Sequence, residues 1–294
     1  MPSTRDYKNR IRSVKNTQQI TRAMKLVAAS KVRRAQERIE SARPYSEKME
    51  ELVHSLAQRV EGEPHPLLRD TMKSDRALLL VISSDKGLCG SYNTNINRQA
   101  LQLIRKREEE GKETELVVVG RKVCTFLSIR GFSFKEEFQE VYGKIDFSLA
   151  QTISDILMKA FLEEDFDEIH ILTTEFVSIL TQNAGLMRLL PLAPAAPDAV
   201  DPVGEPVSVD YIYEPSMERV LETILPQHIT VQVFRALLDA EASEFGSRMT
   251  AMDSATRNAE EMIDSLTLKM NRARQASITK ELLEVVAGAD ALSG

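Results

Sequence analysis

Cysteine, histidine and long apolar runs are all scarce in this chain of 294 residues. Its two cysteines, Cys89 and Cys124, are too few for a disulfide framework or a zinc site, and we expect small buried thiols. The histidines are far apart and show no metal-binding spacing, so no metal site is expected. No apolar stretch reaches the roughly 18 to 20 residues that cross a bilayer, and the start, MPSTRDYKNRIRS, lacks the apolar core of a signal peptide. We therefore predict a protein that does not span a membrane.

Glycine and proline are nearly absent from both ends of the chain. Glycine first occurs at position 62, and residues 1–60 are predicted to form one long helix, with a kink near residues 41–45 because of Pro44. A second helical segment is predicted over residues 214–294, where the only helix breakers between Met217 and Ala287 are Pro226 and Gly246.

Apolar residues in both helical segments recur at alternating spacings of four and three. In the first segment they are Ala28, Val32, Ala35, Ile39 and Ala42, followed after the proline by Tyr45, Met49, Leu52 and Leu56. In the second they are Phe245, Met249, Met252, Thr256, Ala259, Ile263, Leu266, Met270, Ala273 and Ser277. A sustained period of 3.5 residues winds helices into a left-handed supercoil, so we predict an antiparallel coiled coil between the two ends of the chain. Two helices cannot hide all of these apolar positions, so part of the pair should lie inside a partner.

Residues 74–213 have a different pattern, in which short apolar runs alternate with helix-length segments. Strands are predicted at residues 77–83, 116–120 and 168–174, and helices at 92–109, 121–129 and 146–163. Prolines then mark a connector at about residues 191–208. The predicted fold class is α/β, in which an open, mostly parallel, Rossmann-like sheet domain is combined with the long two-helix coiled coil.

Positive charge is concentrated at the N-terminus. Residues 1–43 contain twelve Lys or Arg and three acidic residues, a net charge of +9 that leaves −15 for the rest of a chain whose total is −6. Such an uneven distribution points to an acidic partner, which could be nucleic acid, a membrane surface or acidic protein loops.

The sequence SSDKGLCGSYN at residues 83–93 follows an apolar strand and could be taken for a phosphate-binding turn. It lacks the glycine spacing of phosphate-binding loops, and Lys86 precedes the glycines instead of following them. We expect Gly87 and Gly90 to adopt positive φ, and Ser91 or Asn93 to cap the next helix. No nucleophile with a nearby base and no paired carboxylates in an apolar setting are recognisable elsewhere, so we predict neither catalytic residues nor a bound cofactor.

Five segments together carry a resemblance to a known family. They are TQQITRAMKLVAASKVRRAQ at 17–36, SSDKGLCGSYNTNI at 83–96, DYIYEPS at 210–216, FGSRMTAMDSATRNA at 245–259 and NRARQASITKELLEVVAGADAL at 271–292. In this order and spacing the chain resembles the gamma subunits of F-type ATP synthases. Residues 105–115 and 191–208 match no pattern of that family.

The resemblance implies a rotor shaft that is not itself catalytic. Its coiled coil would stand, one copy per complex, in the cavity of a hexamer of three alpha and three beta subunits. Its α/β domain would meet the epsilon subunit and the membrane-embedded ring of c subunits. No transit peptide is recognisable, which favours a bacterial chain on the cytoplasmic face of the inner membrane, in contact with the membrane only through the c ring, although a processed mitochondrial chain would also lack one.

The resemblance also implies roles for individual residues. Positions that match the family's contacts with the alpha and beta sleeve are Met24, Lys25, Arg248, Arg274, Gln275 and Thr279. Positions that match its contacts with epsilon and the c ring are Tyr211, Tyr213 and Glu214. Our own inference, not a family assignment, is that Lys31, Arg33 and Arg34 help to steer assembly onto acidic loops.

Two other classes of protein are open at this point. A basic helix followed by heptads resembles a DNA-binding coiled coil, although here the heptad seam lies inside the basic segment. A Rossmann-type enzyme with helical arms is the second alternative. The first predicts binding of DNA and the second binding of a dinucleotide, whereas the rotor hypothesis predicts no nucleic-acid partner.

Overall fold

The computed structural model describes residues 3–59, 65–68, 75–164, 166–192 and 217–293. They form two compact units. The terminal unit consists of Met1–Ala29 and Arg248–Gly294, and the sheet unit consists of Ser30–Ser247. Two long helices, α1 (Thr4–Arg59) and α5 (Met217–Ser293), contribute to both units.

The sheet unit contains a five-stranded sheet in the order β3-β2-β1-β4-β5. β1 (Arg76–Ile82), β2 (Glu113–Val119), β3 (Glu136–Phe138) and β4 (Glu168–Phe176) are parallel, and β5 (Gln182–Leu190) is antiparallel to β4. The helices between the strands are α2 (Tyr92–Glu109), α3 (Arg121–Ser128) and α4 (Phe147–Glu163), and a short 3-10 helix, η1 (Pro66–Leu68), precedes β1. The sheet is thus open and mostly parallel, as predicted.

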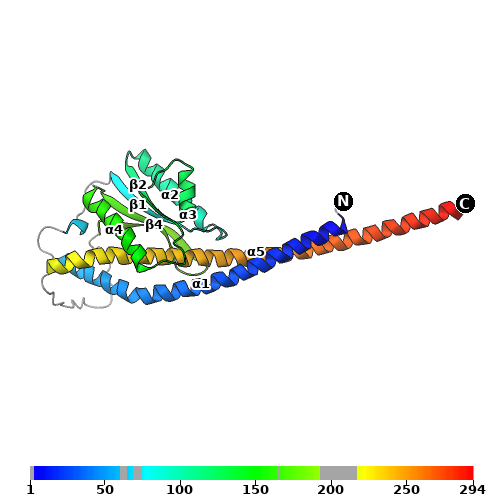
Figure 1. Ribbon diagram of the computed structural model, residues 1–294, viewed down its shortest axis with the longest axis horizontal. Coiled ribbons are helices and arrows are strands. Elements are labelled where there is room, and N and C mark those ends of the chain that lie inside the picture. Colours follow the sequence, from blue (N-terminus) through cyan, green and yellow to red (C-terminus); the bar gives the residue numbers. More distant parts are fainter. Residues whose placement is uncertain (1–2, 60–64, 69–74, 165, 193–216, 294) are drawn as a thin grey trace, which may run out of the picture. The chain divides into compact units, whose positions relative to one another are not determined.

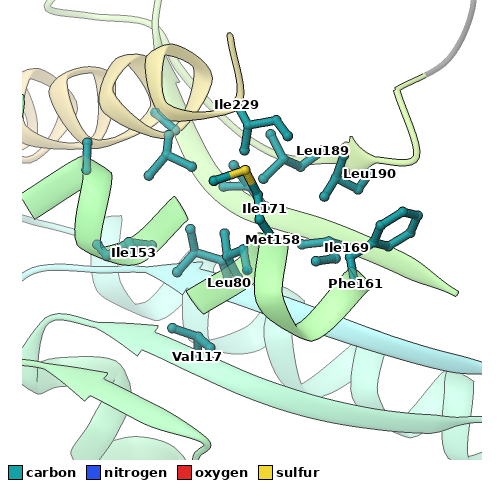
Figure 2. Packing of buried hydrophobic residues seen from close by; sticks show 14 of the residues in the cluster. Leu80, Val117, Ile153, Met158, Phe161, Ile169, Ile171, Leu189, Leu190 and Ile229 are labelled. Atoms are coloured by element: carbon teal, nitrogen blue, oxygen red, sulfur yellow. The ribbon is translucent and has the colours of Figure 1, made fainter. Parts of the chain in front are cut away.

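Apolar cores lie on both faces of this sheet because successive strand residues point to opposite sides. Along β1, Leu78 and Leu80 face the core that contains residues of α4 and α5, whereas Leu79 and Val81 face the core that contains residues of α2 and α3. Figure 1 shows these helix pairs on the two faces. Figure 2 shows Ile153, Met158 and Phe161 of α4 and Ile229 of α5 among strand residues of the first core. A sheet covered on both faces explains why residues 77–82 of β1 and 116–119 of β2 are continuous apolar runs instead of alternating ones.

The predicted elements of the sheet domain agree with the structure to within a few residues, but two strands were not predicted. Helix α2 has the predicted bounds, and α4 begins one residue after Asp146, whose carboxylate accepts a hydrogen bond from the Leu149 N–H as an N-cap. β3 has only three residues and two of them are acidic. β5 is an edge strand with mostly exposed side chains, so it lacks the buried apolar run by which the other strands were recognised.

The apolar seam of α1 keeps its alternation through Pro44, so the prediction that it resumes at Tyr45 is wrong. In the sheet unit the buried and half-buried positions follow one alternation of four and three, at Val32, Ala35, Ile39, Ala42, Ser46, Met49, Val53 and Leu56. Tyr45, which was predicted in the seam, is 54% exposed, and Ser46 is buried in its place. A proline leaves the helix period unchanged when the chain remains helical, and α1 is continuous across this position.

Helices α1 and α5 run antiparallel in each unit. In the terminal unit Thr21 contacts Thr256 and Lys25 contacts Asp253; in the sheet unit Lys31 contacts Phe245 and Arg38 contacts Glu241. Within each unit the residue number falls along α5 as it rises along α1. The predicted antiparallel pairing of the chain's two ends is therefore confirmed.

Candidate partner-contact surfaces

Lys25 is a predicted partner contact whose ammonium group is already paired within the terminal unit. Its Nζ lies 2.5 Å from Oδ1 of Asp253, and Arg257 approaches the other carboxylate oxygen at 3.4 Å. The hydrogen bond from Lys25 is the largest cause that holds the pKa of Asp253 below its usual value. Both side chains of the pair are about one-third exposed, so the ammonium is accessible to a partner. Met24, beside it, is half-buried.

A second polar contact lies one helical turn away. The hydroxyl of Thr256 donates to that of Thr21 at 2.8 Å, and Thr21 is buried. A polar contact inside an apolar seam is satisfied in only one alignment of the helices, so it specifies their register. With Thr21 opposite Thr256, the first residue of α1 lies opposite a residue of α5 near Ala273.

Helix α5 therefore continues beyond its α1 partner within the terminal unit (Figure 1). From position 274 to position 287 every side chain is exposed, including the predicted contacts Arg274, Gln275 and Thr279. The Thr279 hydroxyl bonds back to the Gln275 carbonyl at 3.0 Å, which satisfies it without a partner chain. Ser277, predicted in the seam, is exposed because α1 does not reach it.

The overhanging part of α5 carries an apolar group that the sequence analysis missed. Its members are Ile278, Leu282, Leu283, Val285 and Val286, and we call them the tip cluster. A signal was present, because Ile278, Leu282 and Val285 are spaced four and three, one residue out of step with the predicted seam. The pattern was therefore readable as a second apolar face, beyond the end of the two-helix pair.

The basic residues Lys31, Arg33 and Arg34 of α1 are exposed. Arg33 donates to Glu37 one turn later at 3.0 Å, and Arg34 is exposed. Lys31 lies over the ring of Phe245, with its Nζ 4.8 Å from the centroid. Arg248, which belongs to the terminal unit, is half-buried. Exposed guanidinium groups of this kind can steer an acidic partner, although single exposed ion pairs contribute only about 0 to 1 kcal/mol.

A buried carboxylate that the sequence analysis also missed connects three segments of the sheet unit. Glu241 of α5 accepts from Arg38 of α1 at 2.9 Å and from the backbone N–H of Gly143 at 2.8 Å. The same guanidinium donates to the carbonyl of Ile145. Nearby, the hydroxyl of buried Tyr92 donates to the Ala240 carbonyl at 3.2 Å. These bonds join both long helices to the loop that precedes α4.

The glycine turn at residues 83–93 uses its polar groups to hold itself together. Asn93 accepts from the N–H and the hydroxyl of Ser84, at 3.1 and 2.9 Å. Gly90 has φ 58°, as predicted, but the other left-handed residue is Leu88, so the prediction for Gly87 is wrong. Ser91 occupies the N-cap position without a side-chain cap bond, and Asn93 turns back to Ser84 instead, so the capping prediction is also wrong.

Asp85 and Gly120 close the crevice at the carboxyl ends of β1 and β2, where open α/β sheets bind ligands. The Asp85 carboxylate accepts from the backbone N–H groups of Arg121, Glu140 and Tyr142 at 2.9 to 3.2 Å. Gly120 has φ 99°, and a Cβ there would lie 2.2 Å from the Ser83 carbonyl oxygen. Backbone and carboxylate thus occupy the space in which a dinucleotide-binding domain holds phosphate.

Three predicted contacts, Tyr211, Tyr213 and Glu214, lie outside the described residues. Both cysteines are buried, as predicted, and burial raises the pKa of the Cys124 thiol to about 11. Over the described ranges, no three metal-ligating side chains cluster, and none of the helices is both long and apolar enough to traverse a bilayer.

Comparison with known proteins decides the family. The ATP synthase family model matches residues 3–292. The ATP synthase gamma chain of Geobacter sp. (strain M21) is 45% identical over 296 aligned positions, which cover all of both chains. The chain belongs to the ATP synthase gamma family.

Solved structures agree with this assignment. The central stalk and c-ring structure of the Tetrahymena thermophila mitochondrial ATP synthase matches with a TM-score of 0.61 and 25% identity, over 80% of this chain and 99% of that one. A chain of the Euglena gracilis mitochondrial enzyme in its OSCP, F1 and c-ring structure matches with a TM-score of 0.66 at 17% identity, over 98% and 94%, which shows the fold alone. As a gamma-family member the chain is a non-catalytic central-stalk subunit of an ATP synthase. Neither the DNA-binding alternative nor the dinucleotide-dependent enzyme has support from these matches.

Proposed function

We propose that this chain couples rotation of a proton-driven c ring to the conformational cycle of three catalytic sites in a hexamer of three alpha and three beta subunits. One copy serves each complex. Residues 1–60 and 214–294 form the shaft, and residues 74–213 form the domain that meets epsilon and the c ring. The chain would then work on the cytoplasmic face of the bacterial inner membrane and touch that membrane only through the c ring.

The tip cluster is the observation that best supports this proposal. Its five side chains are between 49% and 69% exposed, on a part of α5 without a helix partner among the described residues. Burying an exposed Leu, Ile or Val side chain contributes about 1.5 to 3 kcal/mol. A contiguous apolar surface of this kind is typical of a protein-protein contact. Enclosure of the helix end by a ring of partner subunits would remove the cluster from water on all sides.

Asymmetry would make such a shaft an effector. A two-helix shaft cannot present the same face to three beta subunits at once, so each catalytic site would contact a different surface. An effector shifts a conformational equilibrium only by its differential contacts with the two states. Met24, Lys25, Arg33, Arg34, Arg248, Arg274, Gln275 and Thr279 are the side chains that we assign to these contacts. We assign Tyr211, Tyr213 and Glu214 to epsilon and the c ring, on family resemblance alone.

Reconstitution tests the proposal. The purified chain is mixed with cognate alpha and beta subunits, and the stoichiometry and the ATPase activity of the product are measured. The proposal predicts a hexamer with one copy of the chain and cooperative ATP hydrolysis. Failure to form a complex, together with binding of DNA or a dinucleotide by the chain alone, would refute it.

A pair of matched variants then tests the tip cluster itself. Leu282→Ser and Val285→Ser should lower ATP-driven proton pumping per ATP hydrolysed in membranes that carry the whole enzyme, because the shaft end loses its apolar contacts. Leu162→Ser is the control, since Leu162 is 50% exposed on α4 of the sheet unit. Equal coupling ratios in all three variants would contradict the assignment of the tip cluster to the sleeve.

A further inference from the structure

A cavity of about 340 Å³ lies in the sheet unit between α1, α5 and the end of β4. It lies apart from the candidate partner-contact residues and from the glycine turn, although Ile39, Ala42 and Ser46 of the α1 seam form part of its wall. Its size falls within the range of sites that hold small organic molecules. One part of its wall is aromatic and another is charged, so it has the two-part character of a ligand site.

The apolar wall is formed by side chains from three elements. Phe147 at the start of α4 and Phe234 of α5 pack edge to face, with ring centroids 5.7 Å apart, and Phe176 of β4 also lines the cavity. Phe147 remains 46% exposed, so part of its ring surface is available to a ligand. An aromatic or alkyl group could bury its surface against these rings.

Asp239 of α5 forms the polar part of the wall. Its side chain is only 13% exposed, yet among the residues that the structure describes none donates a hydrogen bond to its carboxylate. The nearest cation is Arg235, whose Nε is 3.9 Å away and whose side chain is 52% exposed. A buried carboxylate without hydrogen bonds is costly, and it is relieved by a donor that carries positive charge.

The surrounding charges favour a cation as well. The cavity is lined by the acids Glu47 of α1, Glu175 of β4 and Asp239, against Arg43 of α1 and Arg235 of α5. Glu50 of α1 faces the adjoining groove, which shares Glu175, Arg235 and Asp239. Among the described residues, acidic groups therefore outnumber basic ones around Asp239. Burial, and secondarily Glu175, raise the pKa of Asp239 to about 6, so its carboxylate is charged but poorly compensated at neutral pH.

An unused hydroxyl supplies a further polar group at the cavity. Ser46 of α1 is 4% exposed and lines the same space, and over the described residues its Oγ has no hydrogen-bond partner. Buried hydroxyls in folded proteins are nearly always bonded to protein or water. An acceptor of this kind complements an ammonium group, which has three N–H donors.

We propose that this cavity binds a small amphipathic amine, with its apolar body against Phe147, Phe176 and Phe234 and its ammonium group on Asp239. The site is separate from the proposed sleeve contacts, since none of the described residues that we assign to the sleeve lines it.

Three compounds with one body and different head groups test the proposal. The full chain is titrated calorimetrically at pH 7.5 with 4-phenylbutylamine, with the neutral 4-phenylbutan-1-ol and with the anionic 4-phenylbutyrate. The amine should bind one saturable site at least about tenfold more tightly than the alcohol, since a hydrogen bond to a charged group contributes more than a neutral one. The carboxylate should bind most weakly.

Substitution and pH then locate the ammonium group. Asp239→Asn should reduce the affinity for the amine to that for the alcohol, and Asp155→Asn, on the exposed side of α4, should leave both unchanged. Lowering the pH from 7.5 to 5 should weaken amine binding about tenfold, because protonation of Asp239 removes its charge, and should not affect the alcohol. Thermal unfolding of each variant verifies that it is folded.

Three results would overturn the proposal. They are equal affinities for amine and alcohol, unchanged amine affinity in folded Asp239→Asn, and no saturable binding of the amine. Phe147→Ala tests the contact with the apolar body independently of the contact with the head group. It should weaken binding of the amine and of the alcohol by a similar factor. A selective loss of amine binding in that variant would place the ammonium group elsewhere.

Discussion

The ammonium group of Lys25 and the carboxylate of Asp253 meet at 2.5 Å, although the two residues are 228 positions apart in the chain. Their side chains are about one-third exposed, one turn from the hydroxyl contact between Thr21 and Thr256. Polar contacts at the seam fix the register of α1 on α5 in the terminal unit. We propose the same ammonium as a contact with the alpha and beta sleeve, and such a contact would have to share or replace Asp253.

Removing the Lys25 ammonium should raise the pKa of Asp253. We expect the pKa in Lys25→Met to move up toward the unperturbed value of 3.8, because the lysine hydrogen bond is the main cause of its depression. In the wild type the pair stabilises the folded chain above that value, and the stabilisation is lost as the pH falls through the lower pKa of the folded state. Carboxyl carbon chemical shifts measured by NMR against pH give the pKa directly. An identical titration in the variant would show that the pair does not persist in solution.

Gly120 should tolerate no side chain. Gly120→Ala would place a Cβ 2.2 Å from the Ser83 carbonyl oxygen at φ 99°, and we expect it to lower the free energy of unfolding by more than about 3 kcal/mol. Gly111→Ala is the matched control, since Gly111 also has positive φ, 72°, but a Cβ added there would meet no atom within 4 Å. Its cost should be only about 1 to 2 kcal/mol. Urea denaturation measures the loss of unfolding free energy in each variant. Equal losses would mean that the backbone at Gly120 does not lie close to Ser83 in solution.

Sequence reasoning succeeded where local pattern decides structure. The bounds of α2 and the seam from Ala28 to Ala42 follow from periodicity and helix breakers, which need no knowledge of the rest of the fold. It failed at Tyr45, because a proline was assumed to reset a period that the continuous helix retains. It also missed β5, in which Gly185 and Arg188 interrupt the apolar residues and only Leu189 and Leu190 are buried.

The candidate sites show the same division. The exposed residues Arg274, Gln275 and Thr279 were predicted as contacts from the resemblance to the gamma family. Their expected partners lie outside the chain. The tip cluster was visible as a spacing but had no meaning until the structure showed where α1 ends. Contacts such as Arg38 with Glu241, 203 positions apart, depend on the whole fold and leave no local pattern.

Asp239 should make stability depend on pH. Its pKa is about 6 when folded, above the unperturbed 3.8, so its favourable contribution is complete below 3.8 and is lost as the pH rises through 6. Asp239→Asn removes this dependence. The free energy of unfolding of the variant, relative to that of the wild type, should therefore rise by up to about 3 kcal/mol between pH 4 and pH 7.5. Unfolding by urea at the two pH values measures the difference, and a parallel loss in both proteins would show that another group is responsible.

Glu241 should be far less replaceable than an exposed carboxylate. Its side chain is 3% exposed and accepts from both Arg38 and the Gly143 N–H, so Glu241→Ala leaves the Nη1 of Arg38 and a backbone donor without their acceptor. Removing one partner of a buried ion pair costs about 3 to 5 kcal/mol, and Glu241→Gln should cost less because its carbonyl oxygen can still accept one of the bonds. Glu51→Ala, which breaks an exposed contact with Lys48, should cost no more than about 0.5 kcal/mol.

The order of these three costs tests the joint between the long helices and the loop before α4. Hydrogen exchange of the Gly143 amide adds a local readout, because this amide should lose protection in Glu241→Ala and keep part of it in Glu241→Gln. If Glu241→Ala were no more destabilising than Glu51→Ala, the buried bonds would not hold the loop to α5. The attachment of the sheet domain to the helices in the sheet unit would then rest on apolar packing, through residues such as Ile229 and Leu237, and on other bonds such as that from Tyr92 to the Ala240 carbonyl.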